Sequence, residues 1–117
     1  MAVHYIGGLE PIFDVKWASV APTAAAAVQV ASANRGRRWI AITCPAVTSW
    51  PAQLLLCNGM PNLVTQNYAA IQIEKGGSVV FSLTGDMPWA GAIYAIGIGG
   101  TSGLIAAEAT DYPKDAD

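Results

Sequence analysis

Residues 94–100 read YAIGIGG, a short apolar run that ends in a glycine turn. In a β-strand, successive side chains point to opposite faces of the sheet. Tyr94 and Ile96 should therefore face one side, and Ile93 and Ala95 the other. Neither side carries a charge, so the stretch is predicted to be a strand whose outer face also needs a cover. That cover can come from the chain itself or from another subunit.

Short strands separated by turns are predicted along much of the chain. The clearest is RRWIAIT (37–43), in which apolar residues alternate in the period of a strand. The others are AAAAVQV (24–30), AQLLLC (52–57), AAIQI (69–73), SVVFSL (78–83), AIYAIGI (92–98) and SGLIAAEA (102–109). The last two are expected to pair across a GGTS hairpin turn, because glycine tolerates positive φ. About seven short strands at regular spacing predict an all-β fold, a small antiparallel β-sandwich or barrel.

The first 23 residues do not fit this strand pattern, because glycines and prolines interrupt them. They are predicted to form an extended N-terminal arm (1–23), followed by the sandwich domain (24–110) and an acidic C-terminal tail (111–117). Large aromatic rings release much free energy when they are buried. The arm is therefore expected either to dock on another surface or to wrap its own domain, through Tyr5, Ile6, Phe13 and Trp17.

The composition is poor in charge. Charged residues make up 12% of the 117 residues, about half of the roughly 25% usual for soluble domains. No uncharged apolar run reaches the roughly 18 residues of a membrane-spanning helix, so no membrane partner is expected. Burial of the surface against other subunits explains the deficit better, which predicts a homo-oligomer.

The two cysteines are expected to be small buried hydrophobic residues. The start of the chain lacks the basic and apolar regions of a signal peptide, which suggests synthesis in a reducing cytosol, where structural disulfides are rare. A disulfide between Cys44 and Cys57 stays open.

A basic cluster lies in NRGRR (34–38) and contains Arg35, Arg37 and Arg38. It is either a solvated turn before a strand or a contact with an acidic neighbour or with packaged nucleic acid. With a formal net charge of −2, the chain is not expected to bind nucleic acid.

The sequence lacks a recognisable catalytic set. Its one histidine, His4, lies in the predicted arm, which is a poor place for a preorganised base. The glycine-rich GIGGTSG (97–103) lacks the Lys-Ser/Thr ending of a phosphate-binding loop. No enzymatic activity, cofactor or metal site is therefore expected.

Trp50 and Trp89 stand next to prolines in predicted loops. Aromatic residues in loops are candidates for recognition. The alternative is that both rings plug the ends of the sandwich core.

Four stretches between residues 28 and 110 resemble small β-sandwich virion proteins of tailed bacteriophages. They are VQVASANRGRRWIAIT, QLLLCNG, AIQIEKGGSVVF and WAGAIYAIGIGGTSGLIAAEAT. Proteins of this group are decoration, cement or minor capsid proteins. The chain departs from them in its aromatic arm and in the apolar loop CPAVTSWP (44–51).

The resemblance implies a structural virion protein that binds the capsid surface and clamps adjacent capsid subunits. Its partners would be the major capsid protein or other virion subunits, and the oligomer would be a trimer. The expected contacts are the four arm residues named above, the three arginines and the two loop tryptophans. The alternative is a tail or fibre module that recognises a host-surface glycan through an exposed platform of Trp50 and Trp89.

Overall fold

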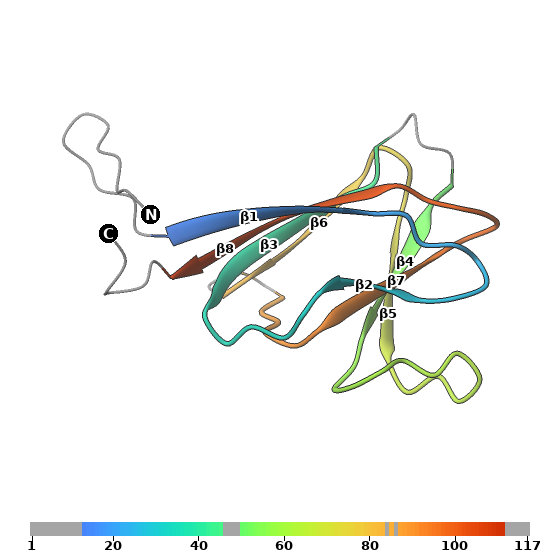
Figure 1. Ribbon diagram of the computed structural model, residues 1–117, viewed down its shortest axis with the longest axis horizontal. Helices are drawn as coiled ribbons and strands as arrows, with labels where there is room; N and C mark the ends of the chain where they lie inside the picture. Colours follow the sequence, from blue (N-terminus) through green and yellow to red (C-terminus); the bar gives the residue numbers. More distant parts are fainter. Residues whose placement is uncertain (1–12, 46–49, 84, 86, 112–117) are drawn as a thin grey trace.

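The structure of the chain is a computed structural model that describes residues 13–45, 50–83, 85 and 87–111. These residues form eight strands and no helix (Figure 1). The strands are β1 (Phe13–Val20), β2 (Val28–Ala31), β3 (Arg37–Thr43), β4 (Ala52–Leu56), β5 (Ala69–Ile73), β6 (Ser78–Ser82), β7 (Ile93–Gly97) and β8 (Leu104–Asp111). The predicted all-β class is confirmed.

The strands form two antiparallel sheets of four, in the orders β1-β8-β3-β6 and β2-β7-β4-β5. Four of the pairs join β1 to β8, β2 to β7, β3 to β6 and β4 to β5. The chain therefore follows the path of one long hairpin folded over itself, which is the connectivity of an eight-stranded jelly roll. The predicted sandwich is confirmed, with eight strands in place of about seven.

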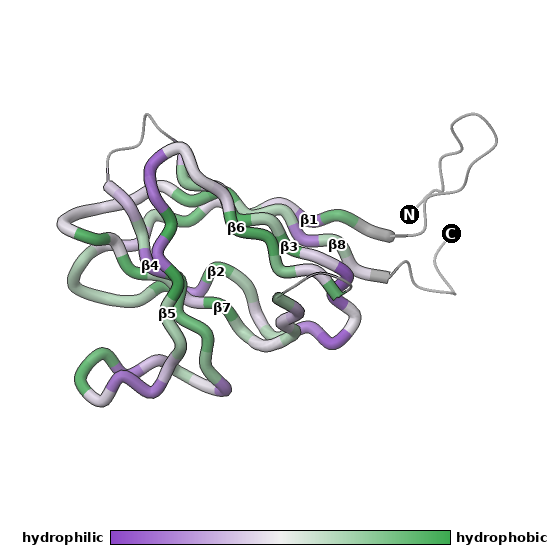
Figure 2. Tube along the Cα trace, turned by 180° about the vertical axis from the view of Figure 1, so that it is seen from behind, coloured by the Kyte–Doolittle hydropathy of each residue, from purple (hydrophilic) through white to green (hydrophobic). Residues whose placement is uncertain are grey.

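The core lies between the two sheets and follows from the alternation of apolar residues. Ile40 and Ile42 of β3 are fully buried, as are Leu54 of β4 and Ile93 of β7. In β7, Tyr94 and Ile96 lie on the outer side and are half-buried, as the pattern predicts. Figure 2 shows hydrophobic residues along β3 and β6 and hydrophilic ones in several of the turns.

The predicted hairpin between residues 92–98 and 102–109 is wrong, because β7 and β8 belong to different sheets. Their connection crosses from one layer to the other beside the connection between β1 and β2. The amide of Gly97 donates to the carbonyl oxygen of Thr23 (2.9 Å), and the amide of Ser102 donates to that of Pro22 (2.9 Å). Gly99 has a φ of 90°, so the glycine-rich turn is needed, but it links two sheets.

The predicted boundary between arm and sandwich is also wrong. Residues 13–20 form β1, which pairs with β8 along its whole length and is an edge strand of the first sheet. The segment FDVKWASV has the alternation of a strand, which the glycines and prolines on either side concealed. Tyr5 and Ile6 lie outside the described residues, as does the predicted tail beyond Asp111.

Candidate functional site

The outer face of the sheet β1-β8-β3-β6 is built almost entirely from apolar and small residues. The register of the strands places twelve described side chains on it, here called the apolar face. They are Val15, Trp17 and Ser19 of β1; Ile105, Ala107 and Ala109 of β8; Trp39, Ala41 and Thr43 of β3; and Ser78, Val80 and Ser82 of β6. None of these residues is charged, whereas the free face of an antiparallel sheet is usually polar.

Several large side chains on the apolar face are open to solvent. Trp17 is 73% exposed and Val80 is 49% exposed, and the two lie on the opposite edge strands β1 and β6. Between these edges, Ala107 and Ala109 of β8 are buried. The register sets Ala107 beside Trp17, and Ala109 between the larger residues Val15 and Trp39. The face is thus bulky at Trp17 and Trp39 and low at the two alanines of β8.

The outer face of the second sheet is also uncharged among the described residues, but it mixes polar residues with Leu55, Ala70 and Ile96. Gln29, Gln53 and Gln72 lie on it with Tyr94, according to the register. The Nε2 of Gln29 donates to the Tyr94 hydroxyl at 3.4 Å. The chain's own amide side chains therefore flank the outer side of the YAIGIGG strand, so part of its cover is local.

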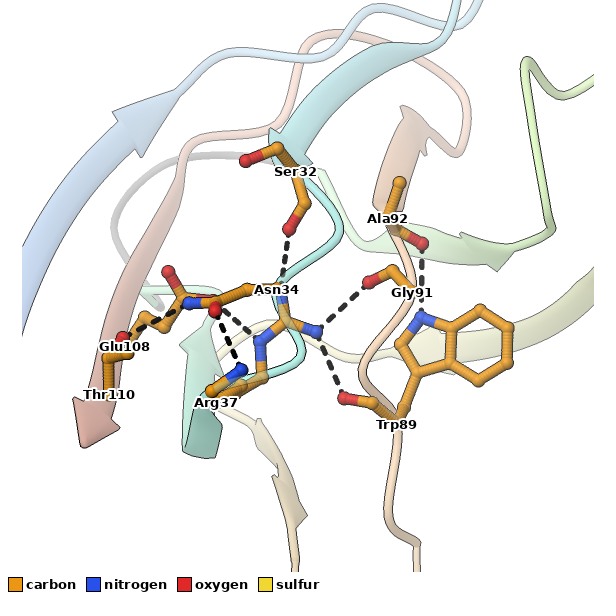
Figure 3. A network of polar contacts seen from close by, with 9 residues as sticks. Ser32, Asn34, Arg37, Trp89, Gly91, Ala92, Glu108 and Thr110 are labelled. Atoms are coloured by element: carbon orange, nitrogen blue, oxygen red, sulfur yellow. Dashed lines mark hydrogen bonds and ion pairs between the residues drawn. The ribbon is translucent and has the colours of Figure 1, made fainter.

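Arg37 does not reach out to a partner, although the basic cluster suggested that it would. Its residue is only 4% exposed, and its guanidinium lies at one end of the sandwich (Figure 3). The Nε donates to Glu108 Oε2 at 2.5 Å, and the terminal nitrogens donate to the carbonyl oxygens of Ser32, Trp89 and Gly91 at 2.8–3.0 Å. Arg37 thus ties β3 and β8 of the first sheet to the segments that flank β2 and β7 of the second. Its assignment as an interface contact is wrong.

Asn34 holds the turn that leads to Arg37, a role that the sequence analysis missed. Its Oδ1 accepts a hydrogen bond from the amide of Gly36 at 3.0 Å, and its Nδ2 donates to Thr110 Oγ1 at 3.1 Å. The asparagine-glycine spacing of NRGRR was the available signal, since asparagine commonly bonds the backbone two residues on.

Arg35 and Arg38 lie beside a surface cavity of about 240 Å³ at the same end of the sandwich. Arg35 is exposed and Arg38 is half-buried. The cavity is also lined by Leu83, Pro88 and Trp89. This arrangement of cationic and apolar groups can receive a carboxylate, and the prediction that these two arginines make contacts stays a prediction.

Trp50 and Trp89 do not form a platform, because they lie at opposite ends of β7. Trp89 precedes this strand, is packed against the core and donates its indole N–H to the carbonyl oxygen of Ala92 at 3.0 Å. Trp50 is partly exposed and covers the turn that follows β7, where a Cβ added at Gly99 would lie 2.8 Å from its ring. The end-plug interpretation therefore fits Trp89, and the shared platform is wrong.

The two cysteines are buried and free, as expected of small hydrophobic residues. Cys44 follows β3 and Cys57 follows β4, and these strands belong to different sheets. The Cys57 thiol donates to the carbonyl oxygen of Gly59 at 2.8 Å. In the part of the chain that the structure describes, no three His, Cys, Asp or Glu residues are grouped so that they could hold a metal ion. The same residues contain no helix long and apolar enough to span a membrane.

No family model matches the chain, and no curated protein matches it. A solved structure from work on Bacillus endospore appendages, described as a novel family of disulfide-linked pili, is similar to it in fold. The similarity covers 97% of this chain and 100% of that one, with 13% sequence identity and a TM-score of 0.48. A resemblance this distant does not identify a function.

Proposed function

We propose that this chain is a non-enzymatic structural protein of a tailed-phage virion, which binds the outer capsid surface and clamps adjacent capsid subunits. The observation that supports the proposal is the distribution of charge. Apart from Asp111, the last residue of β8, the described strands place no charged residue on the outer face of either sheet. Burying such faces against other subunits requires no desolvation of an ion, which would be costly.

Four of the other charged residues lie in turns or in an ion pair, where they do not obstruct such contacts. Arg35 is exposed in the turn before β3, and Glu74 and Lys75 are exposed in the turn before β6. Glu108 is already paired with Arg37. A subunit with uncharged faces and charged turns is suited to assembly with other subunits.

The resemblance to virion proteins supplies the partner in this proposal, because the fold alone does not. Jelly rolls serve viral capsids, lectins and several enzyme families. Many modest contacts, made at the same time to neighbouring capsid subunits, would give tight attachment because each later contact forms at high effective concentration. The exposed guanidinium of Arg35 would add a contact to a capsid carboxylate.

No observation favours the glycan-binding alternative. Its predicted platform needs Trp50 and Trp89 side by side, and the two residues lie at opposite ends of β7. A jelly roll can carry a lectin site elsewhere, but the described residues contain no second pair of neighbouring exposed aromatic rings in a loop.

The test uses capsids of the phage that encodes the chain, assembled in its absence. The purified chain is added to them, and its binding is measured. We expect binding that saturates at a fixed copy number per capsid, with adjacent capsid subunits held more firmly against heat. Arg35→Glu should weaken the uptake, and Val64→Lys, which changes a 91% exposed residue in a loop, serves as the matched control. Absence of uptake at chain concentrations up to about 100 μM would sink the proposal, since even weak specific contacts are detected there.

A further inference from the structure

We propose that two copies of the chain pack face to face through the apolar face, related by a two-fold axis that runs parallel to its strands. This inference goes beyond capsid attachment and does not depend on it. If the chain dimerises in solution but does not bind capsids, this inference stands and the proposal of capsid binding is wrong.

The first argument is charge. A surface that meets its own copy across a two-fold axis brings like charges together when it is charged, and this costs affinity. The twelve residues of the apolar face are uncharged, so they bring no like charges together. One of them, Trp17, is 73% exposed. An uncharged face that exposes tryptophan, valine and isoleucine is expected to be covered by another protein surface.

The second argument is size. A two-fold axis parallel to the strands, through the middle of the sheet order β1-β8-β3-β6, sets β1 of one copy over β6 of the other. The axis keeps each residue at its level along the strands, so Trp17 meets Val80 of the other copy and Val15 meets Ser82. In the same arrangement β8 lies over β3, so Ala109 meets Trp39 of the other copy and Ala107 meets Ala41. Large residues thus face small ones at the level of Val15 and Trp39, and at the level of Trp17 two exposed apolar side chains cover each other.

The third argument is area, which sets how stable the pair can be. Four strands about 4.8 Å apart and some six residues of each strand cover roughly 400 Å² per copy. A standard stable interface buries about 800 Å² per partner. The pair should therefore be reversible, so the measurement is sedimentation equilibrium over a wide range of chain concentration.

The test uses two substitutions on opposite edges of the apolar face. Trp17→Lys and Val80→Glu each place a charge opposite an apolar residue of the other copy, and each should weaken self-association at least about tenfold. The double variant places each new lysine opposite a new glutamate across the axis and should recover most of the affinity. Within one copy the two positions are three strand spacings, or about 14 Å, apart, so no pair can form inside the chain.

The controls separate loss of the pair from loss of the fold. Both substituted residues are exposed, so the thermal unfolding curve of each single variant should match that of the natural chain. Val64→Lys introduces a charge at an exposed apolar residue away from the face and should leave the association unchanged. A chain that stays monomeric up to about 1 mM overturns the inference. So does a trimer, an association that neither single variant weakens, or a double variant no stronger than the singles.

Discussion

Arg37 illustrates, at the scale of a single residue, what the sequence could not predict. Its neighbours in NRGRR suggested a solvated turn, yet three of its four acceptors are backbone carbonyl oxygens, from residues 32, 89 and 91. No pattern of side chains in the sequence shows which backbone carbonyl groups will lie next to the guanidinium of Arg37 in the fold. The inward residues Ile40 and Ile42, in contrast, follow directly from the alternation in RRWIAIT, because burial acts on every second side chain.

The contribution of Arg37 to stability can be measured directly. Arg37→Ala would leave the Glu108 carboxylate, 15% exposed, without its cation and would remove the link between the two sheets. We expect a loss of about 3–5 kcal/mol in the free energy of unfolding, which is typical when one partner of a buried ion pair is removed. The measurement is urea unfolding. The control is Arg35→Ala, an exposed change that should stay within about 0.5 kcal/mol. Equal losses for the two variants would contradict this account.

At the scale of elements, the sequence predicted strands more reliably than their partners. Alternation reveals that 92–98 and 102–109 are extended, but it does not say which strand each of them pairs with. Six residues that include Gly99 and Gly100 separate β7 from β8, which is enough to cross between layers. The strand β1 was missed because its alternation covers only 13–20, between segments rich in glycine and proline.

The edge position of β1 makes a prediction about amide hydrogen exchange. β1 pairs with β8 on one side alone, whereas β8 pairs with both β1 and β3. In an antiparallel edge strand, alternate amides point away from the neighbour and have no partner in the sheet. We therefore expect every second amide of β1 to exchange fast, while most amides of β8 exchange slowly, as measured by NMR.

The same measurement distinguishes two ways in which copies can associate. Face-to-face packing covers side chains and leaves the outward amides of β1 fast at every chain concentration. Edge-to-edge pairing of β1 strands would protect these amides as the concentration rises. Protection that appears in all amides of β1 would contradict the face-to-face pair.

At the scale of the whole molecule, the low charge content found in the composition takes a definite form. The charges are not spread evenly. Apart from Asp14 and Lys16 on the edge strand β1 and Asp111 at the end of β8, those of the described residues lie in turns and at the end of the sandwich near Arg37. Composition alone predicted that some surface is covered. The register of the strands was needed to show that the uncharged residues gather on the faces of the two sheets.

This separation predicts how self-association responds to salt. The Debye length falls from about 10 Å at 0.1 M to about 3 Å at 1 M, so contacts between exposed charges weaken strongly over this range. An association through the apolar face involves no charge, and its dissociation constant should change less than about threefold between 0.1 M and 1 M NaCl. Sodium sulfate should strengthen it, because excluded salts favour the burial of apolar surface. Sedimentation equilibrium in both salts measures the effect. A dissociation constant that rises about tenfold or more in NaCl would instead place the contact at the charged turns, such as that of Arg35.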